Sequence, residues 1–274
     1  MRKVAVPETV KDLHERARLI RGTPAERAAL FWLMFGPLQR WRNVRTGLEL
    51  MRTHRPYSRE LNGTAQLVIE VAGDSAAAGV GAGPRESLPE LFAMHAPRAT
   101  VRTIAVPGAT IAKTIRQVRQ SQGRVDVMFL GVGGNDFFQG TPEAEMERGS
   151  MLLLHWAFQR ARVVLLTYGG NPRYAPIFTA RRNGRWYPTS ASELMGRRAA
   201  TLRKIYCAAE NRHRDRLAVL DLHDFCEQAH FQAAPARYFT IDGTHPNKWS
   251  YWAAFYEARD ALRDRFDIDL GSIR

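Results

Sequence analysis

The sequence predicts a three-layer α/β/α domain built on a five-stranded parallel sheet, with a helical extension at the N-terminus. Past residue 65, short β-branched runs alternate with longer helical stretches, which is typical of βαβ units. Two of the short runs, residues 127–130 and 163–166, are continuously apolar, as parallel strands are when helices cover both faces of the sheet. The 274 residues and 45% apolar content are enough to bury a substantial core.

The predicted elements follow one another in a regular order. Strands are expected at 66–72, 99–105, 125–131, 162–168 and 216–222. Helices are expected near 87–95, 111–120, 142–159, 191–212 and 248–265. In open parallel sheets ligands bind at the carboxyl ends of the strands, so a functional site is expected there.

The first 60 residues are expected to form a separate helical extension, and residues 61–274 the main domain. Thr23, Pro24 and Glu26 form a capping box ahead of the apolar run 28–38, which predicts a helix start. Residues 1–60 hold 13 basic and 6 acidic residues, so +7 of the net charge of +13 lies there. The segment 23–45 could contact anionic lipid, or it could pack on the domain with its arginines in water.

Composition excludes several classes of protein. The two cysteines and the scattered histidines have no zinc-ligand spacing, so we expect neither a metal nor a cofactor. The longest apolar run has 11 residues, fewer than the roughly 20 that a membrane-spanning helix needs. Acidic residues interrupt the first 20 positions, which argues against a secretory signal. We therefore expect a cytoplasmic protein, with peripheral attachment to a membrane as the alternative. We expect no nucleic-acid partner, because the arginines are dispersed and no recognised binding module is present.

Three residues that could offer a hydroxyl, a backbone N–H or a side-chain amide follow the first three predicted strands, where each strand ends. Ser75 follows the first strand and opens a small-residue run, which suits a nucleophile but also an ordinary strand-to-helix turn. Gly108 follows the second strand, and its amide could point into a cleft. Asn135 follows the third strand, where its side chain could donate to an oxyanion or form a simple turn with Asp136. These alternatives stay open for each residue taken alone.

A fourth block, residues 241–247, lies just before the last predicted helix. Asp242 stands three residues before His245, close enough in one turn for the carboxylate to accept the imidazole Nδ1–H. That contact would leave Nε2 free to take a proton from a serine hydroxyl. An Asp-x-x-His pair alone is often only a loop hydrogen bond, but here it accompanies the other three blocks.

Together the blocks Gly-Asp-Ser, Pro-Gly-Ala-Thr, Gly-Gly-Asn-Asp and Asp-Gly-Thr-His-Pro-Asn resemble those of the SGNH (GDSL-type) hydrolases, over roughly residues 65–265. The resemblance implies a flavodoxin-like fold and an acyl-serine mechanism. Ser75 would be the nucleophile, His245 the base and Asp242 the acid that orients it. The oxyanion hole would be the backbone N–H groups of Ser75 and Gly108 with the side-chain amide of Asn135.

Further residues are candidates for substrate binding. Asp74, Phe137 and Phe138 adjoin the predicted catalytic residues, although aromatic residues at a helix start usually serve the core. Arg173 lies in a long segment, 169–190, that leaves the fourth strand and could reach over the site. The tryptophans of the last helix, Trp249 and Trp252, are expected to pack that helix on the sheet.

We therefore expect hydrolysis of a carboxylic ester, with a small-molecule or lipid-like ester as substrate. An esterase, lipase, deacetylase or lysophospholipase all fit the four blocks. Two alternatives stay open. An acyltransferase would use the same acyl-enzyme, and a membrane-peripheral binding protein would keep the fold without turnover.

Overall fold

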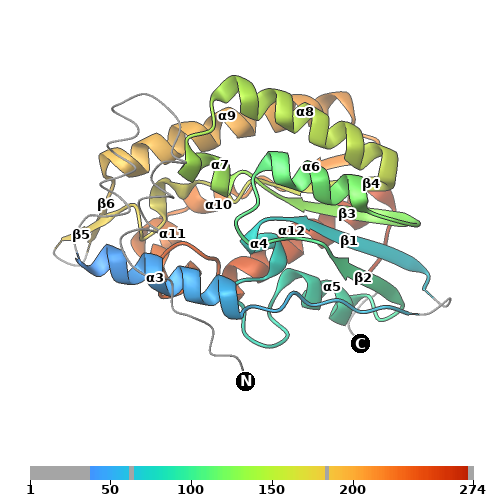
Figure 1. Cartoon of the computed structure of the whole chain (residues 1–274), viewed down its shortest axis with the longest axis horizontal. Helices are drawn as coiled ribbons and strands as arrows, with labels where there is room; N and C mark the ends of the chain where they lie inside the picture. The colour runs from blue at the N-terminus through green and yellow to red at the C-terminus, as the bar shows by residue number, and fades with distance from the viewer. Residues whose placement is uncertain (1–37, 62–64, 183–184, 271–274) are drawn as a thin grey trace.

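The computed structural model describes residues 38–61, 65–182 and 185–270. Five parallel strands form one sheet in the order β2-β1-β3-β4-β7 (Figure 1). They are β1 (Leu67–Gly73), β2 (Ala99–Thr103), β3 (Val125–Gly131), β4 (Ala161–Thr167) and β7 (Leu217–Val219). The predicted five-stranded parallel sheet is confirmed. Each strand lies within its expected range to within one residue, except that β2 and β7 end earlier.

Helices cover both faces of the sheet, which completes the predicted three layers (Figure 1). One face carries α6 (Ile111–Gln120), α8 (Glu143–Arg160) and α9 (Ser190–Arg212). The other carries α5 (Leu88–His95) and α12 (Lys248–Phe266). All five helices were predicted, and none of their bounds differs from the expected one by more than one residue.

The continuously apolar strands are buried on both faces, as their sequences predicted. Along β3, Met128 and Leu130 belong to the core beneath α6, α8 and α9, whereas Val127 and Phe129 belong to the core beneath α5 and α12. Alternate side chains thus feed two separate cores. This double burial fixes the register of β3, which pairs with β1 and with β4.

In the sheet, β1 lies between β2 and β3. The chain runs from β1 to β2 on one side and then crosses back to β3 on the other side, so the strand order reverses direction at β1. Ligands bind at such a switch in doubly wound sheets, outside the carboxyl ends of the strands. Two short helices begin there: α4 (Ser75–Ala78) follows β1, and α7 (Gly134–Gln139) follows β3. A helix start was expected at Ser75, but neither element was among the helices predicted by range, because each spans about one turn.

The segment 169–190 is not a plain loop. It holds the 3₁₀ turn η1 (Pro172–Tyr174) and an antiparallel hairpin of β5 (Ala180–Arg182) and β6 (Arg185–Tyr187). Beyond β7, the chain forms α10 (His223–Glu227), α11 (Ala229–Ala233) and η2 (Pro235–Tyr238). The side chains of the arginines at 181, 182 and 185, which were expected in this segment, lie outside the described residues.

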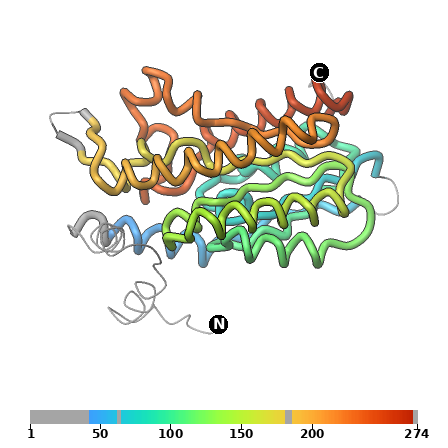
Figure 2. Tube along the Cα trace, turned by 90° about the horizontal axis from the view of Figure 1, so that it is seen from above, coloured from blue at the N-terminus to red at the C-terminus, as the bar shows by residue number. Residues whose placement is uncertain are grey.

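The expected N-terminal extension contributes helix α3 (Leu38–Thr53). Both views place α3, in blue, at the end of the sheet that also carries the β5-β6 hairpin (Figure 1, Figure 2). The capping box at 23–26, the apolar run 28–37 and most of the segment expected to contact lipid lie outside the described residues. The division of the chain at residue 60 stays a prediction.

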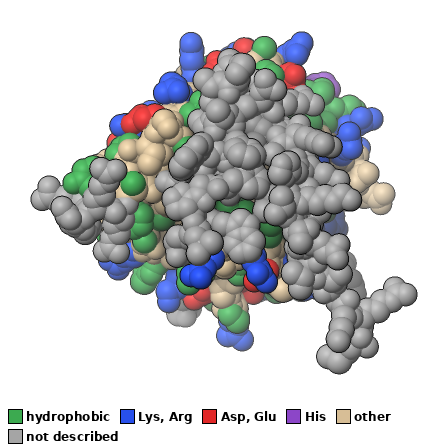
Figure 3. All heavy atoms as spheres, turned by 60° about the vertical axis from the view of Figure 1, so that its left-hand side comes forward, with side chains coloured by type: hydrophobic (Ala, Val, Ile, Leu, Met, Phe, Trp, Pro, Cys, Tyr) green, Lys and Arg blue, Asp and Glu red, His purple; other side chains and the backbone are tan. Residues whose placement is uncertain are grey.

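The described surface mixes charges of both signs. Around the grey atoms in Figure 3, basic side chains are scattered among acidic ones. Several basic residues of the described surface form ion pairs, such as Arg259 with Asp260. None of the helices in the described ranges combines the length and the hydropathy of a membrane-spanning segment. Trp252 packs on the core beneath α12, as expected. Trp249 is instead 46% exposed, and the cations of Arg237 and Lys248 each lie 5.3 Å from the centre of its ring.

Candidate active site

The predicted nucleophile lies where β1 gives way to α4. Asp74 caps this short helix, since its carboxylate accepts a hydrogen bond of 2.9 Å from the N–H of Ala76. Ser75 is the first helical residue, so its N–H has no partner within the helix. Gly73 makes the turn possible: its φ is +137°, and a Cβ there would lie 2.0 Å from the carbonyl oxygen of Gly131. Only glycine lets β1 and β3 approach this closely.

Gln117, which the sequence did not single out, holds this turn from α6. Its Oε1 accepts a 2.8 Å hydrogen bond from the N–H of Gly73, and its Nε2 donates one of 3.0 Å to the Gly73 carbonyl oxygen. The side chain therefore satisfies the Gly73 N–H and is a second donor to its carbonyl oxygen, which also accepts a 3.0 Å hydrogen bond from the N–H of Val106. The backbone next to Ser75 is fixed on both sides.

The structure brings Ser75, His245 and Asp242 together in one line. The Ser75 Oγ lies 3.0 Å from Nε2 of His245, across 170 residues of sequence. The Nδ1 of the same imidazole lies 2.5 Å from Oδ2 of Asp242. The imidazole is 6% exposed and the carboxylate 1% exposed, so water has little access to either contact.

The Asp242 carboxylate is held in its ionised form. Burial alone would raise its pKa, but the hydrogen bond and charge of His245, with hydrogen bonds from Thr240 and Thr244, outweigh burial and lower the pKa. Its Oδ1 accepts from the Thr240 hydroxyl at 2.6 Å and from the N–H groups of Thr244 and His245 at 2.8 and 2.9 Å. Because three donors occupy Oδ1, Oδ2 faces the imidazole.

Ser75, Gly108 and Asn135, the three residues predicted to form an oxyanion hole, all line one cavity. Within the described part of the chain, the N–H groups of Ser75 and Gly108 have no hydrogen-bond partner. Gly108 has φ of +80°, a backbone conformation that glycine adopts readily. The Asn135 Nδ2 donates one hydrogen to the carbonyl oxygen of Ala109 at 3.0 Å, which leaves its second hydrogen free for a ligand.

Asp136 fixes these donors relative to one another. It is 2% exposed, and its carboxylate accepts hydrogen bonds from the N–H of Ile111 at 2.9 Å and from the hydroxyl of Thr141 at 3.2 Å. It thereby ties α7, which carries Asn135, to the start of α6, just after Gly108. Burial raises the pKa of Asp136 to about 6, and burial does the same to Asp74. The sequence showed Asp136 only as the partner of Asn135 in a turn.

The raised pKa of Asp136 gives a testable pH dependence of stability. Because the folded-state pKa of about 6 exceeds the ordinary value of 3.8, folding takes up a proton between these pH values. The stabilising contribution of this carboxyl is complete below about pH 4 and is lost as the pH rises through about 6. We expect Asp136→Asn to remove this dependence. The melting temperature of the variant minus that of the wild type should therefore rise between pH 4.5 and pH 7.5.

The matched control for this measurement is Asp215→Asn, which changes an exposed carboxyl. Its difference in melting temperature from the wild type should stay constant over the same pH range. A constant difference for Asp136→Asn as well would show that the buried carboxyl does not titrate as its burial demands. The loss of one hydrogen-bond acceptor would change the melting temperature of the variant by the same amount at every pH. It cannot produce a difference that grows with pH.

The cavity beside Ser75 has a volume of about 570 Å³ and walls that are mostly apolar. Of the candidate substrate-binding residues, Asp74, Phe137 and Phe138 line it. Phe137 is 2% exposed and also belongs to the core, whereas Phe138 is half-buried and packs at 5.2 Å, centroid to centroid, against Phe178. Across the described ranges, no group of three or more His, Cys, Asp or Glu side chains could hold a metal ion.

Arg173, the fourth candidate, lies outside this group. Its guanidinium forms an ion pair of 2.7 Å with Glu193 at the start of α9, and its neighbour Pro172 lines the cavity in its place. The expected contact of Arg173 with the cavity is therefore not what the structure shows. The segment 169–190 does reach the site, but through apolar residues such as Ile177 and Phe178.

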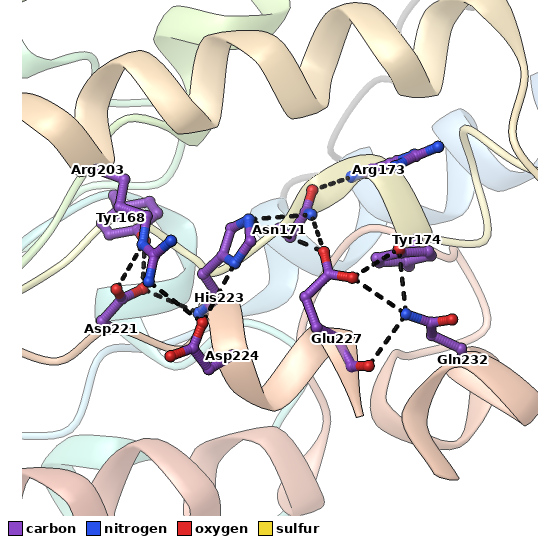
Figure 4. Close-up of polar contacts among 10 residues, drawn as sticks. All are labelled: Tyr168, Asn171, Arg173, Tyr174, Arg203, Asp221, His223, Asp224, Glu227 and Gln232. Carbon is purple, nitrogen blue, oxygen red and sulfur yellow. Dashed lines mark hydrogen bonds and ion pairs between the residues drawn. The ribbon is translucent and has the colours of Figure 1, made fainter. Parts of the chain in front are cut away.

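A polar network holds the start of that segment in position (Figure 4). Asp221, after β7, accepts hydrogen bonds from the Tyr168 hydroxyl and from Arg203 on α9. Glu227 on α10 accepts one of 2.8 Å from Asn171. These contacts join the end of β4 to α9 and α10, so the cavity wall that follows Tyr168 rests on a fixed support.

Several solved structures have a similar fold. A member of the lipolytic protein G-D-S-L family from Veillonella parvula aligns with 70% of this chain and 96% of its own, with 15% identity and a TM-score of 0.53. An extracellular lipase from Streptomyces rimosus aligns with 73% of this chain and 100% of its own, with 16% identity and a TM-score of 0.52. A salicylyl-acyltransferase from a tetracycline biosynthetic pathway aligns with 75% and 56%, with 14% identity and a TM-score of 0.50. At these identities the similarity is one of fold.

No curated protein sequence matches the chain. The sequence profile of the GDSL-like lipase/acylhydrolase family matches residues 71–253, more than half of the chain. This range contains the four blocks on which the SGNH resemblance was based, and the flavodoxin-like strand order agrees with it. The chain therefore belongs to the GDSL-like lipase/acylhydrolase family.

Proposed function

We propose that the protein hydrolyses a carboxylic ester through an acyl-serine intermediate. One observation carries the proposal: a hydroxyl, an imidazole and a buried carboxylate lie in line at 3.0 and 2.5 Å, beside a mostly apolar cavity. A binding protein has no need of this alignment. Membership of a hydrolase family supports the same reading.

The proposed reaction begins with attack of the Ser75 Oγ on the ester carbonyl carbon, while Nε2 of His245 takes the hydroxyl proton. The carbonyl oxygen becomes an oxyanion, which the N–H groups of Ser75 and Gly108 and the Nδ2 of Asn135 stabilise. The bond to the alcohol oxygen then breaks, and the imidazolium gives its proton to the leaving alkoxide. Water adds to the acyl-serine by the same route and releases the acid.

The test uses the full-length chain, p-nitrophenyl acetate and butyrate, and a fluorophosphonate probe whose adduct is located by peptide mass spectrometry. We expect hydrolysis of both esters and a single adduct on Ser75. Ser75→Ala should lose the label, whereas Ser190→Ala, at an exposed serine, should keep it. A chain that neither cleaves the esters nor takes the label at Ser75 is not a serine hydrolase.

Transfer of the acyl group to an alcohol is the second candidate. Because the imidazole is only 6% exposed, water has restricted access to the acyl-enzyme, and an alcohol held in the cavity could compete with it. One of the proteins of similar fold is an acyltransferase. Hydrolysis of p-nitrophenyl butyrate in the presence of glycerol separates the two. Glyceryl ester formed far above the molar share of glycerol in the solvent favours transfer, and butyric acid alone favours hydrolysis.

A further inference from the structure

Helix α3 lies outside the range that matches the family, yet it forms part of the same cavity as Ser75. The α3 residues that line this cavity recur on one face of the helix. They are Asn43, Val44, Gly47, Leu48 and Met51. The opposite face is exposed and charged, with an ion pair between Arg45 and Glu49. Helix α3 is therefore amphipathic, and its less polar face is turned toward the cavity.

Gly47 brings this helix against the catalytic carboxylate. A Cβ at position 47 would lie 2.8 Å from Oδ2 of Asp242 and 3.5 Å from its Cγ. Oδ2 is the atom that accepts the Nδ1–H of His245. Glycine is unfavourable in the middle of a helix, and the close approach to Asp242 explains its presence. The buried state of the Asp242 carboxylate depends in part on this contact.

The apolar residues of α3 face an apolar wall. Val44 packs against the core that contains Phe137, Ile177 and Phe178, all of which line the cavity. Leu48 and Met51 continue the lining along α3. An acyl chain bonded to Ser75 would thus pass between α3 and the residues that follow β3 and β4.

We propose that α3 is one wall of the acyl pocket, that Val44, Leu48 and Met51 select apolar acyl chains longer than acetyl, and that Gly47 is a positioning residue for Asp242. This inference rests on the proposed ester hydrolysis. The acyl half is assigned to the cavity because it stays bonded to Ser75 through the intermediate. The alcohol half has to leave past His245 after the first step.

The test is the ratio of kcat/KM for p-nitrophenyl octanoate to that for p-nitrophenyl acetate, measured on the full-length chain. The wild type should prefer octanoate. Val44→Trp and Leu48→Trp should each lower the ratio by about tenfold or more, because one misfitted methylene in an apolar pocket costs roughly 10- to 200-fold. Met51→Ala should move the optimum toward dodecanoate. Glu49→Gln, on the exposed face, is the matched control and should leave the ratio unchanged.

Gly47→Ala tests the positioning role separately. Displacement of the carboxylate by a fraction of an ångström to about 1 Å should lower kcat by up to about 100-fold at every chain length, with little change in KM or in the octanoate-to-acetate ratio. Melting curves confirm that each variant is folded. An unchanged kcat in a folded Gly47→Ala overturns the positioning role.

The failure of this inference and the failure of the proposed function have different results. A wild type that cleaves no ester and takes no label at Ser75 refutes ester hydrolysis itself. A wild type that is active and labelled, with folded α3 variants whose octanoate-to-acetate ratio equals that of Glu49→Gln, refutes only the pocket wall. The smaller change Val44→Ala serves if a tryptophan variant fails to fold: it should raise the relative activity on dodecanoate, and an unchanged profile contradicts the inference.

Discussion

Ser75→Ala and His245→Ala are each expected to lower kcat for ester hydrolysis by about a million-fold, and the double variant should lose no more than either single variant. The two side chains act as one unit, because the hydroxyl is nucleophilic only while Nε2, 3.0 Å away, takes its proton. Removing either group removes that step completely. The variants should still be faster than the uncatalysed reaction in water, because substrate binding and the oxyanion donors remain.

The measurement is kcat under saturating p-nitrophenyl butyrate for the wild type, the two single variants and the double variant. Ser75→Ala should keep its melting temperature within a few degrees, because the Ser75 Oγ is hydrogen-bonded only to the imidazole among the described side chains. His245→Ala leaves the buried Asp242 carboxylate without its imidazole partner and should melt at a lower temperature, so its melting curve has to show that it is folded. If the double variant instead loses the product of the two single losses, serine and histidine act independently. The proposed proton transfer between them would then be wrong.

The sequence predicted the sheet well because burial on both faces leaves a strong pattern. The runs that became β3 and β4 are apolar throughout, and their bounds were predicted to within one residue. β7 was predicted too long. It pairs only with β4, and after Val219 the chain turns so that Asp221 can meet Tyr168 and Arg203. No pattern within residues 216–222 contains that long-range contact.

The convergence of Ser75, Asp242 and His245 was predictable from motifs at strand ends, but the residues that support it were not. Gln117 is a polar residue within a helix and has the sequence context of a solvated one. Its role depends on Gly73, 44 positions away. Asp136 was interpreted as half of a turn, since its contact with Ile111 forms only when α6 and α7 meet.

Two further features were not predicted: one could have been found in the sequence, and the other was obscured by the way the chain was divided. The β5-β6 hairpin has a recognisable signal, because Asn183 and Gly184 stand between its strands and Asn-Gly is the preferred two-residue hairpin turn. The role of α3 was obscured by the division of the chain at residue 60. That division was based on the capping box and the basic excess of residues 1–60. The described basic residues of α3, Arg42, Arg45 and Arg52, are exposed and are not among the residues that line the cavity.

Asp242→Asn is expected to lower kcat by roughly ten-thousand-fold while the protein stays folded. The reason lies in how the carboxylate is held. Three donors, the Thr240 hydroxyl and the N–H groups of Thr244 and His245, surround Oδ1. An asparagine can satisfy them only by placing its amide oxygen there, which puts its NH₂ group at the position of Oδ2.

That NH₂ group would face Nδ1 of His245, so Nδ1 would have to accept a hydrogen bond and the imidazole proton would move to Nε2. An imidazole protonated at Nε2 cannot take the proton of Ser75, and the nucleophile is left inactive although every atom keeps its place. The measurement is kcat with p-nitrophenyl butyrate, together with the melting temperature. Asp264→Asn changes an exposed carboxylate, and this control should retain full activity. A folded Asp242→Asn that keeps kcat within about tenfold of the wild type would mean that the carboxylate does not set the tautomer, because a tautomer change costs far more than that. The alignment of the three groups would then have no catalytic meaning.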